Sequence, residues 1–213
     1  MDKKRKVAII STIVLLGALT VSISIYANDF LVSKTSEKPN AVTAIDQQHS
    51  EVLAQVGDVA ITKHDVLKFK AYQQLQIASQ ASNSDVNESL SEEFLLEYLI
   101  KEELFLQLAT ERSVDATIEE GIKLAAENKQ ILQSQPQQIM DIHNKLIEAM
   151  EVTEEQYWNE IAPSEYRKII SIQNLTQLLV EDGTIQYDWQ NSDSLGGALN
   201  DFKNSLYEKY QSH

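Results

Sequence analysis

The side chains best suited to acid–base or metal chemistry are scattered along this chain. The histidines are His49, His64, His143 and His213. No two of them have the i, i+4 spacing that places two imidazoles on one face of a helix. The adjacent pairs Glu102–Glu103 and Glu119–Glu120 diverge by about 100° on a helix, so neither pair converges on one proton or ion. No Gly-rich phosphate loop or nucleophile elbow is present. The sequence therefore predicts no catalytic centre, no metal site and no cofactor.

Aromatic side chains offer a different chemistry, the binding of apolar side chains. Flat aromatic faces accept apolar groups of many shapes, so aromatic residues that line a groove between helices would suit extended, unfolded polypeptides. The candidate binding residues are Tyr72, Leu75, Tyr98, Tyr157, Trp158 and Tyr166. The competing interpretation is that these residues belong to the core of the domain.

The elements that position these residues begin with a short β-hairpin. Residues 52–56 alternate with period 2, which predicts a strand with Val52, Ala54 and Val56 on one face. Gly57 favours a tight turn because it adopts positive φ without a Cβ clash. The Val-Ala-Ile run after the turn predicts a second strand that returns alongside the first.

Helices account for most of the remaining sequence. Thr62 with Asp65, and Thr117 with Glu120, have the spacing of helix N-terminal caps, and we expect the same of Ser89 with Glu92. Residues 92–114 carry apolar side chains around most of a helix, which indicates a central helix enclosed by others. A break is expected at Pro136. Three other helices are expected to carry apolar stripes, which are Leu67, Ala71, Leu75 and Ala78; Ile118, Ile122, Ala125 and Leu132; and Ile139, Ile142, Leu146 and Ala149. A last long helix is expected from Tyr166 to Val180.

The N-terminus predicts the compartment. A run of cations at positions 3–6 precedes an uncharged stretch, residues 7–26. Twenty helical residues span about 30 Å, the thickness of a bilayer's hydrocarbon core. The cationic flank stays cytoplasmic, so the rest of the chain is expected outside the cell membrane. We expect an uncleaved single-pass anchor; the alternative is a signal sequence cut near Ala27, which would release a secreted protein.

Composition narrows the function classes further. The chain has no cysteine, which excludes disulfides, thiolate metal sites and a lipid-modified cysteine, and fits an exported protein of a bacterial envelope. Residues 1–27 carry four cations and one anion, so the remainder, with 14 positive and 31 negative residues, has a net charge near −17. Such a surface repels the phosphates of nucleic acids. We therefore expect no nucleic acid partner.

Three blocks of sequence, taken in order, resemble the SurA and PrsA family of extracytoplasmic foldases. Residues 52–66 are similar to the family's V-x-V-N-G-x-x-I-T segment, with Gly57-Asp58 where Asn-Gly is common. The matches to its L-I-x-x-x-L-L-x-Q-x-A helix are Leu99, Ile100, Leu104, Gln107 and Ala109. After this helix, Ser113-Val114 replaces the usual Gly-Ile. Residues 153–158 resemble the family's S-x-E-E-F-W turn.

The resemblance implies a mainly α-helical, SurA N-terminal-like domain with a short β-hairpin, completed by a C-terminal helix. Residues 194–211 supply such a helix, with Leu195, Leu199, Phe202 and Leu206 on one face that needs a partner. In the resembled foldases, prolyl isomerase domains precede the returning helix. Here a connector of about a dozen residues stands in that place, and a parvulin domain needs roughly ninety residues.

Together these observations predict the organisation of the chain and its function. The expected segments are a cytoplasmic basic tail (1–6), a transmembrane anchor or signal sequence (7–26), a polar stalk (27–50), a SurA N-terminal-like chaperone domain (51–180), and a connector with a C-terminal helix (181–213). The resemblance implies a chaperone-like protein that binds unfolded or exported polypeptides without isomerase activity. One alternative is an envelope adaptor with one specific protein partner, and a second is a peptidyl-prolyl isomerase.

Overall fold

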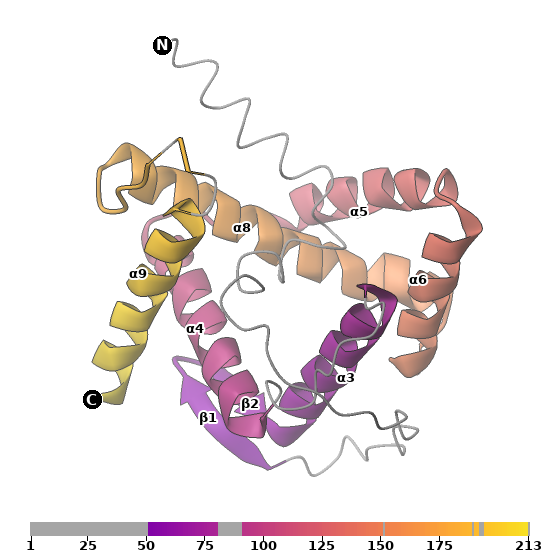
Figure 1. The fold of residues 1–213 in the computed structure, drawn as a ribbon, viewed down its shortest axis with the longest axis horizontal. Helices are drawn as coiled ribbons and strands as arrows, with labels where there is room; N and C mark the ends of the chain where they lie inside the picture. The colour runs from indigo at the N-terminus through magenta and orange to yellow at the C-terminus, as the bar shows by residue number, and fades with distance from the viewer. Residues whose placement is uncertain (1–50, 81–90, 151, 189, 192–193, 213) are drawn as a thin grey trace.

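The computed structural model describes residues 51–80, 91–150, 152–188, 190–191 and 194–212 (Figure 1). The basic tail, the apolar stretch at 7–26 and the stalk expected from the sequence lie outside these residues. Within the described ranges, no helix has the length and apolar character needed to span a bilayer.

The fold is mainly helical and includes one antiparallel two-stranded hairpin, as the sequence predicts. The strands are β1 (Val52–Val56) and β2 (Val59–Thr62). The α-helices are α3 (Lys63–Gln80), α4 (Glu92–Glu111), α5 (Ile118–Gln133), α6 (Gln137–Ala149), α7 (Glu154–Gln156), α8 (Ala162–Glu181) and α9 (Ser194–Gln211), and a π-helical turn, η2 (Tyr157–Ile161), joins α7 to α8.

The hairpin differs from the expected alternation at its first strand. Gly57 has φ 55° at the turn, and Val56 pairs with Val59. A β-bulge between Val52 and Ala54 shifts the register of β1. Val52, before the shift, is 57% exposed and Val56, after it, is fully buried, so the predicted strand is present but its alternation does not extend back to Val52.

Helix starts follow local hydrogen bonding. The Thr62 and Asp65 side chains bond each other's backbone N–H groups ahead of α3. Thr117 forms a capping box with Glu120 at the start of α5. The prediction for α4 was wrong in position, since Ser91 is its N-cap and accepts a hydrogen bond from the backbone N–H of Phe94 at 3.2 Å.

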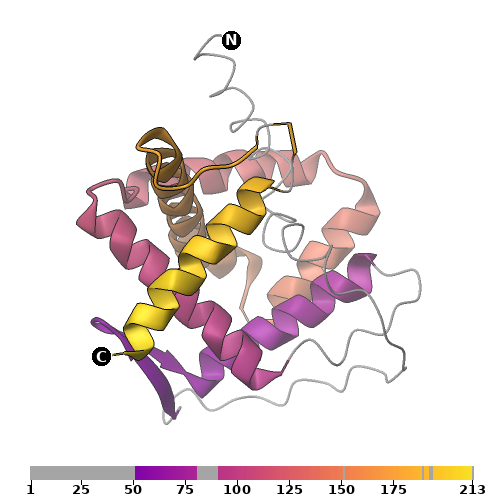
Figure 2. The same ribbon diagram turned by 60° about the vertical axis from the view of Figure 1, so that its left-hand side comes forward.

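Two groups of helices pack against α8, one on each side of it (Figures 1 and 2). On one side, α4 packs against the hairpin, α3 and α9. On the other side, α5 packs along α8, and α6 contacts both α5 and α3. Because α4 also contacts α8, and α3 reaches from the hairpin to α6, the two groups are joined in two places.

The predicted C-terminal helix is present and packs on the core. Phe105, Leu175 and Leu179 are fully buried beside α9. The α9 residues that pack against this cluster include all four predicted ones, Leu195, Leu199, Phe202 and Leu206. The amphipathic face of residues 194–211 is therefore covered by α4 and α8.

The buried face of α5 matches the predicted one only in part. Of the predicted stripe, Ala125 is buried and Leu132 packs against the core, whereas Ile118 and Ile122 are 44% and 52% exposed. Gly121, outside the predicted stripe, is buried. A Cβ atom at Gly121 would lie only 2.1 Å from the carbonyl oxygen of Pro163. Glycine thus lets α5 approach α8 closely, and this approach determines which side of α5 is buried.

The π-helical turn connects α7 and α8 into one continuous helical run. The backbone N–H of Ala162 bonds the carbonyl of Tyr157, five residues back. Pro163 follows directly and has no N–H with which to continue a regular helix. The wider turn accommodates the proline, so the helix that the sequence predicts from Tyr166 begins earlier, at Ala162.

Candidate functional site

The π-helical turn places two large aromatic side chains next to each other. Tyr157 and Trp158 are consecutive, and their rings meet edge to face with centroids 5.1 Å apart. The Trp158 side chain is only 7% exposed, and Tyr157 is half-buried. The pair faces α5 and α6 rather than solvent, because the turn packs against α5 and His143 of α6 contacts both rings.

His143 of α6 completes the packing around this pair. Its ring centroid lies 5.0 Å from that of Tyr157 and 5.3 Å from that of Trp158. The His143 side chain is 4% exposed, and its Nε2 has no hydrogen-bond partner in the described part of the chain. The Nε1 of Trp158 likewise lacks a partner among the described residues.

Two further tyrosines come from α8 and α3. Tyr166 is buried and packs with Trp158. Tyr72 of α3 is half-buried and close enough to raise the pKa of both Tyr157 and Tyr166. We call Tyr72, His143, Tyr157, Trp158 and Tyr166 the aromatic cluster.

The electrostatics of the aromatic cluster favour neutral groups. Burial raises the pKa of Tyr157 to about 12, with smaller contributions from Tyr72 and Glu165. Burial also raises the pKa of Tyr166, so both phenols keep their protons at physiological pH. The Lys129 ammonium lies 5.8 Å from the centroid of the Trp158 ring, within the range of a cation–π contact. The cluster therefore presents apolar faces with neutral polar tips.

The structure brings together four of the six candidate binding residues. Tyr72, Tyr157, Trp158 and Tyr166 belong to the aromatic cluster. Tyr98 lies elsewhere, stacked on Phe69 with ring centroids 5.0 Å apart. Leu75 is on α3, and its side chain lies outside the described part of the chain.

His143 is the member of the cluster that the sequence interpretation missed. The expected stripe on its helix contained Ile139, Ile142 and Leu146, and His143 lies on the same face at i+4 from the first and i−3 from the last. That spacing was the available signal. His64, by contrast, is half-buried in the first turn of α3.

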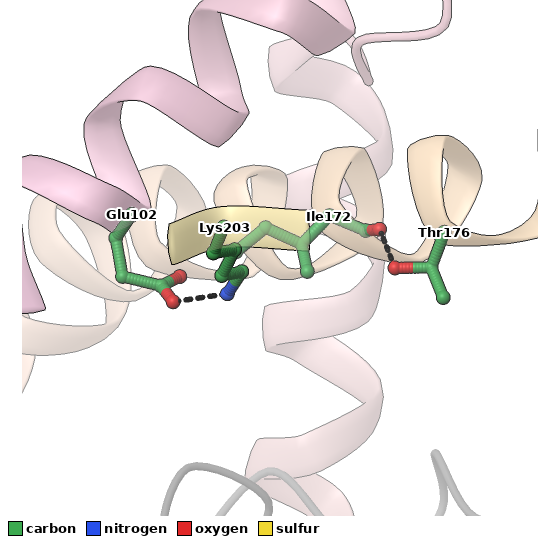
Figure 3. Close-up of polar contacts among 4 residues, drawn as sticks. All are labelled: Glu102, Ile172, Thr176 and Lys203. Atoms are coloured by element: carbon green, nitrogen blue, oxygen red, sulfur yellow. Dashed lines mark hydrogen bonds and ion pairs between the residues drawn. The ribbon is translucent and has the colours of Figure 1, made fainter. Parts of the chain in front are cut away.

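A second polar feature lies between α4 and α9. The Lys203 ammonium forms an ion pair with Glu102 (Figure 3). Lys203 is only 7% exposed, and its nitrogen is 4.9 Å from the centroid of the Phe105 ring. A lysine this deeply buried is unusual unless it is paired. Because the pair forms at only one register of α9 along α4, the contact fixes that register.

The hairpin is tied to both of these helices by side chains. Gln107 of α4 donates its amide N–H to the carbonyl of Val56 at 2.6 Å, and a Cβ at Gly57 would lie 2.4 Å from that amide nitrogen. The Tyr210 hydroxyl of α9 donates to the carbonyl of Gln55 at 2.9 Å. The hairpin turn, the central helix and the C-terminal helix thus form one unit.

No group of three or more His, Cys, Asp or Glu side chains within the described ranges is arranged to hold a metal ion. Comparison of the chain with protein-family models, with curated proteins and with solved structures finds no match.

Proposed function

We propose that this protein is a membrane-anchored, extracytoplasmic chaperone-like protein that binds unfolded or exported polypeptides without isomerase activity. Residues 7–26 would hold it in the cell membrane, and the helical part would lie outside. Binding would be passive: exposed apolar and aromatic side chains capture a segment and release it by mass action.

The observation that carries the proposal is the closure of the C-terminal helix on the N-terminal hairpin. The resemblance to the SurA and PrsA family implies such a returning helix, and α9 packs on α4 and bonds β1 through Tyr210. Gln107, one of the motif residues, bonds the hairpin turn that precedes it by about fifty residues. Two blocks of the resemblance are thereby joined through a direct contact, which supports treating them as parts of one motif.

Exposed apolar side chains provide a starting point for client binding. Phe94, in the first turn of α4, is 52% exposed and lies one turn before Tyr98, a candidate binding residue. On the hairpin, Val59 is 43% exposed. Such side chains would contact apolar groups of a bound chain and gain about 25 cal/mol per Å² of apolar surface buried.

The test is suppression of aggregation, measured by light scattering as a denatured model protein is diluted into buffer with the full-length chain. We expect delayed aggregation at a several-fold molar excess, and a weaker effect for Phe94→Ser. Ile122→Ser is the matched control, because Ile122 is also 52% exposed but lies on α5. No delay at this excess would contradict the proposal.

A protease-coupled peptide assay tests the second half of the proposal. Cis–trans exchange of a prolyl peptide should proceed at the uncatalysed rate in the presence of the protein. Catalysed exchange would favour the isomerase instead. Capture of one partner alone from solubilised envelopes, together with no delay of aggregation, would favour a specific adaptor.

A further inference from the structure

His143 is a buried ionisable side chain that the proposed function does not use. It lies at the middle of α6, and its ring contacts both aromatic residues at the start of the π-helical turn. Through His143, α6 is joined to the helical run that continues into α8. The charge state of this ring therefore acts on a contact between two elements.

The surroundings of His143 suit the neutral imidazole. The Nε2 atom has no hydrogen-bond partner in the part of the chain that the structure describes. The neighbouring indole can donate a proton to a hydrogen bond but cannot accept one. A proton added to the ring would thus create a buried cation without an acceptor.

The charged and titratable groups in and around the aromatic cluster that contains His143 come from α3, α5, α7, the π-helical turn and α8. They are Tyr72 of α3, Lys129 of α5, Glu154 of α7, Tyr157 of the π-helical turn, and Tyr166 and Glu165 of α8. The tyrosines are neutral, and Lys129 already faces the Trp158 ring. A protonated His143 would put a second cation beside the same indole. Glu154 is the acid that favours protonation, and burial outweighs it, so the pKa of His143 is lowered.

We propose that His143 is a pH-sensitive latch, whose neutral ring holds α6 against the π-helical turn and whose protonation in mildly acidic solution releases α6. Leu146 and Ile147 follow on the same helix and are 8% and 7% exposed. Release would expose them to solvent. The inference stands independently of the proposed chaperone function.

The sign of the pH dependence follows from the direction of the shift. Because the folded protein binds the proton less readily than the unfolded chain, acidification favours the unfolded or released form. Stability from this contact is complete above the ordinary histidine pKa of about 6.5. It decreases as the pH falls below that value.

The test uses the fluorescence of Trp158 in the full-length chain kept in a non-ionic detergent. The chain has two tryptophans, so Trp189→Phe leaves Trp158 as the single reporter. As the pH falls from 8 to 4.5, we expect the emission maximum to shift to longer wavelength, with a midpoint below about 6.5. The shift should be lost in His143→Phe, which keeps an aromatic ring without the charge. His64→Gln is the control and should keep the shift.

Hydrogen exchange, corrected for the intrinsic effect of pH, shows where the change occurs. Protection of residues 139–149 should fall on acidification, while that of α4 is retained. Equal loss in α4 and α6, a shift that persists in His143→Phe, or no shift down to pH 4.5 would each overturn the proposal. Should His143→Phe fail to fold, the NMR titration of the His143 ring in the otherwise unchanged protein replaces it. Its midpoint must coincide with the fluorescence midpoint, and a mismatch overturns the latch.

Discussion

Ser113 has φ 56° in the turn that ends α4. Its backbone N–H bonds the carbonyl of Thr110, and that of Val114 bonds the carbonyl of Ala109. These two bonds are the Schellman arrangement, in which the residue at this position is usually glycine. A side chain in the left-handed region is strained because its Cβ crowds the backbone.

We predict that Ser113→Gly stabilises the protein by about 1 kcal/mol, because it removes this strain and leaves the turn's hydrogen bonds in place. The measurement is the midpoint of urea unfolding at an unchanged m-value. Gly183→Ser is the reverse control, since Gly183 has φ 81° after α8 and open space around its missing Cβ. It should lower the midpoint by a similar amount. Unchanged midpoints in both variants would show that the left-handed conformations carry no strain.

The sequence predicted the contacts of some residues and not of others. The caps of α3 and α5 were found because their partners lie three residues away. His143 was missed because an imidazole is polar by type, although its spacing is that of a core residue. The partnership of Glu102 with Lys203, 101 positions apart, leaves no local signal at all.

Among the elements, α5 and α8 make the most extensive contact, and Gly121 lies within it. The closest atoms to a Cβ at Gly121 belong to the backbone of Pro163 and to Arg167. Backbone atoms cannot rotate away as the end of a flexible side chain can. Either α5 must move away from α8 or the added methyl group is not tolerated.

Gly121→Ala should therefore destabilise the protein by about 1–3 kcal/mol, as overpacking of a close contact does. Gly197→Ala is the matched control on α9, because nothing lies within 4 Å of its missing Cβ. It should instead stabilise by about 0.5–1 kcal/mol through the loss of backbone freedom in the unfolded chain. Thermal unfolding of the two variants tests both signs. Similar effects of the two substitutions would contradict the close approach.

The ion pair that holds α9 on α4 calls for a double-mutant cycle. Lys203→Met alone should cost up to about 3 kcal/mol, since it leaves the Glu102 carboxylate without its partner in a partly desolvated position. The double variant with Glu102→Leu should recover most of that loss, because an apolar pair replaces a buried charge pair at little net cost. Urea unfolding of all four proteins gives the coupling energy. Additive effects would show that the two groups do not interact.

Element types were predicted better than element contacts. Helices and the hairpin follow from period, turn chemistry and caps, all of which act within a few residues. The β-bulge, the π-helical turn and the buried face of α5 depend on what each segment packs against. Ile118 and Ile122 show that helical spacing alone does not identify the buried residues, since their apolar spacing is regular and both are exposed.

At the scale of the whole molecule, the proposed membrane anchor is open to direct test. Protease added to intact, wall-stripped cells should digest the chain beyond Ala27 and leave a membrane-bound stub. The physical reason is that, in the proposed orientation, four adjacent cations would hold the N-terminus on the cytoplasmic side while the uncharged stretch would span the bilayer. A soluble chain beginning at Asn28 would instead establish signal cleavage, and full protection from protease would contradict export.

The hydrogen bond between Tyr210 and Gln55 joins residues 155 positions apart. During synthesis the hairpin and α4 emerge first, whereas α9 emerges last. Phe202, the edge-to-face neighbour of Phe105, is synthesised about a hundred residues after it. At the usual rate of translation this delay is roughly 5–20 s. For that interval the side of α4 that α9 will cover is open to other apolar chains. The order of synthesis thus creates an interval in which the exposed side of α4 can bind another chain instead of α9.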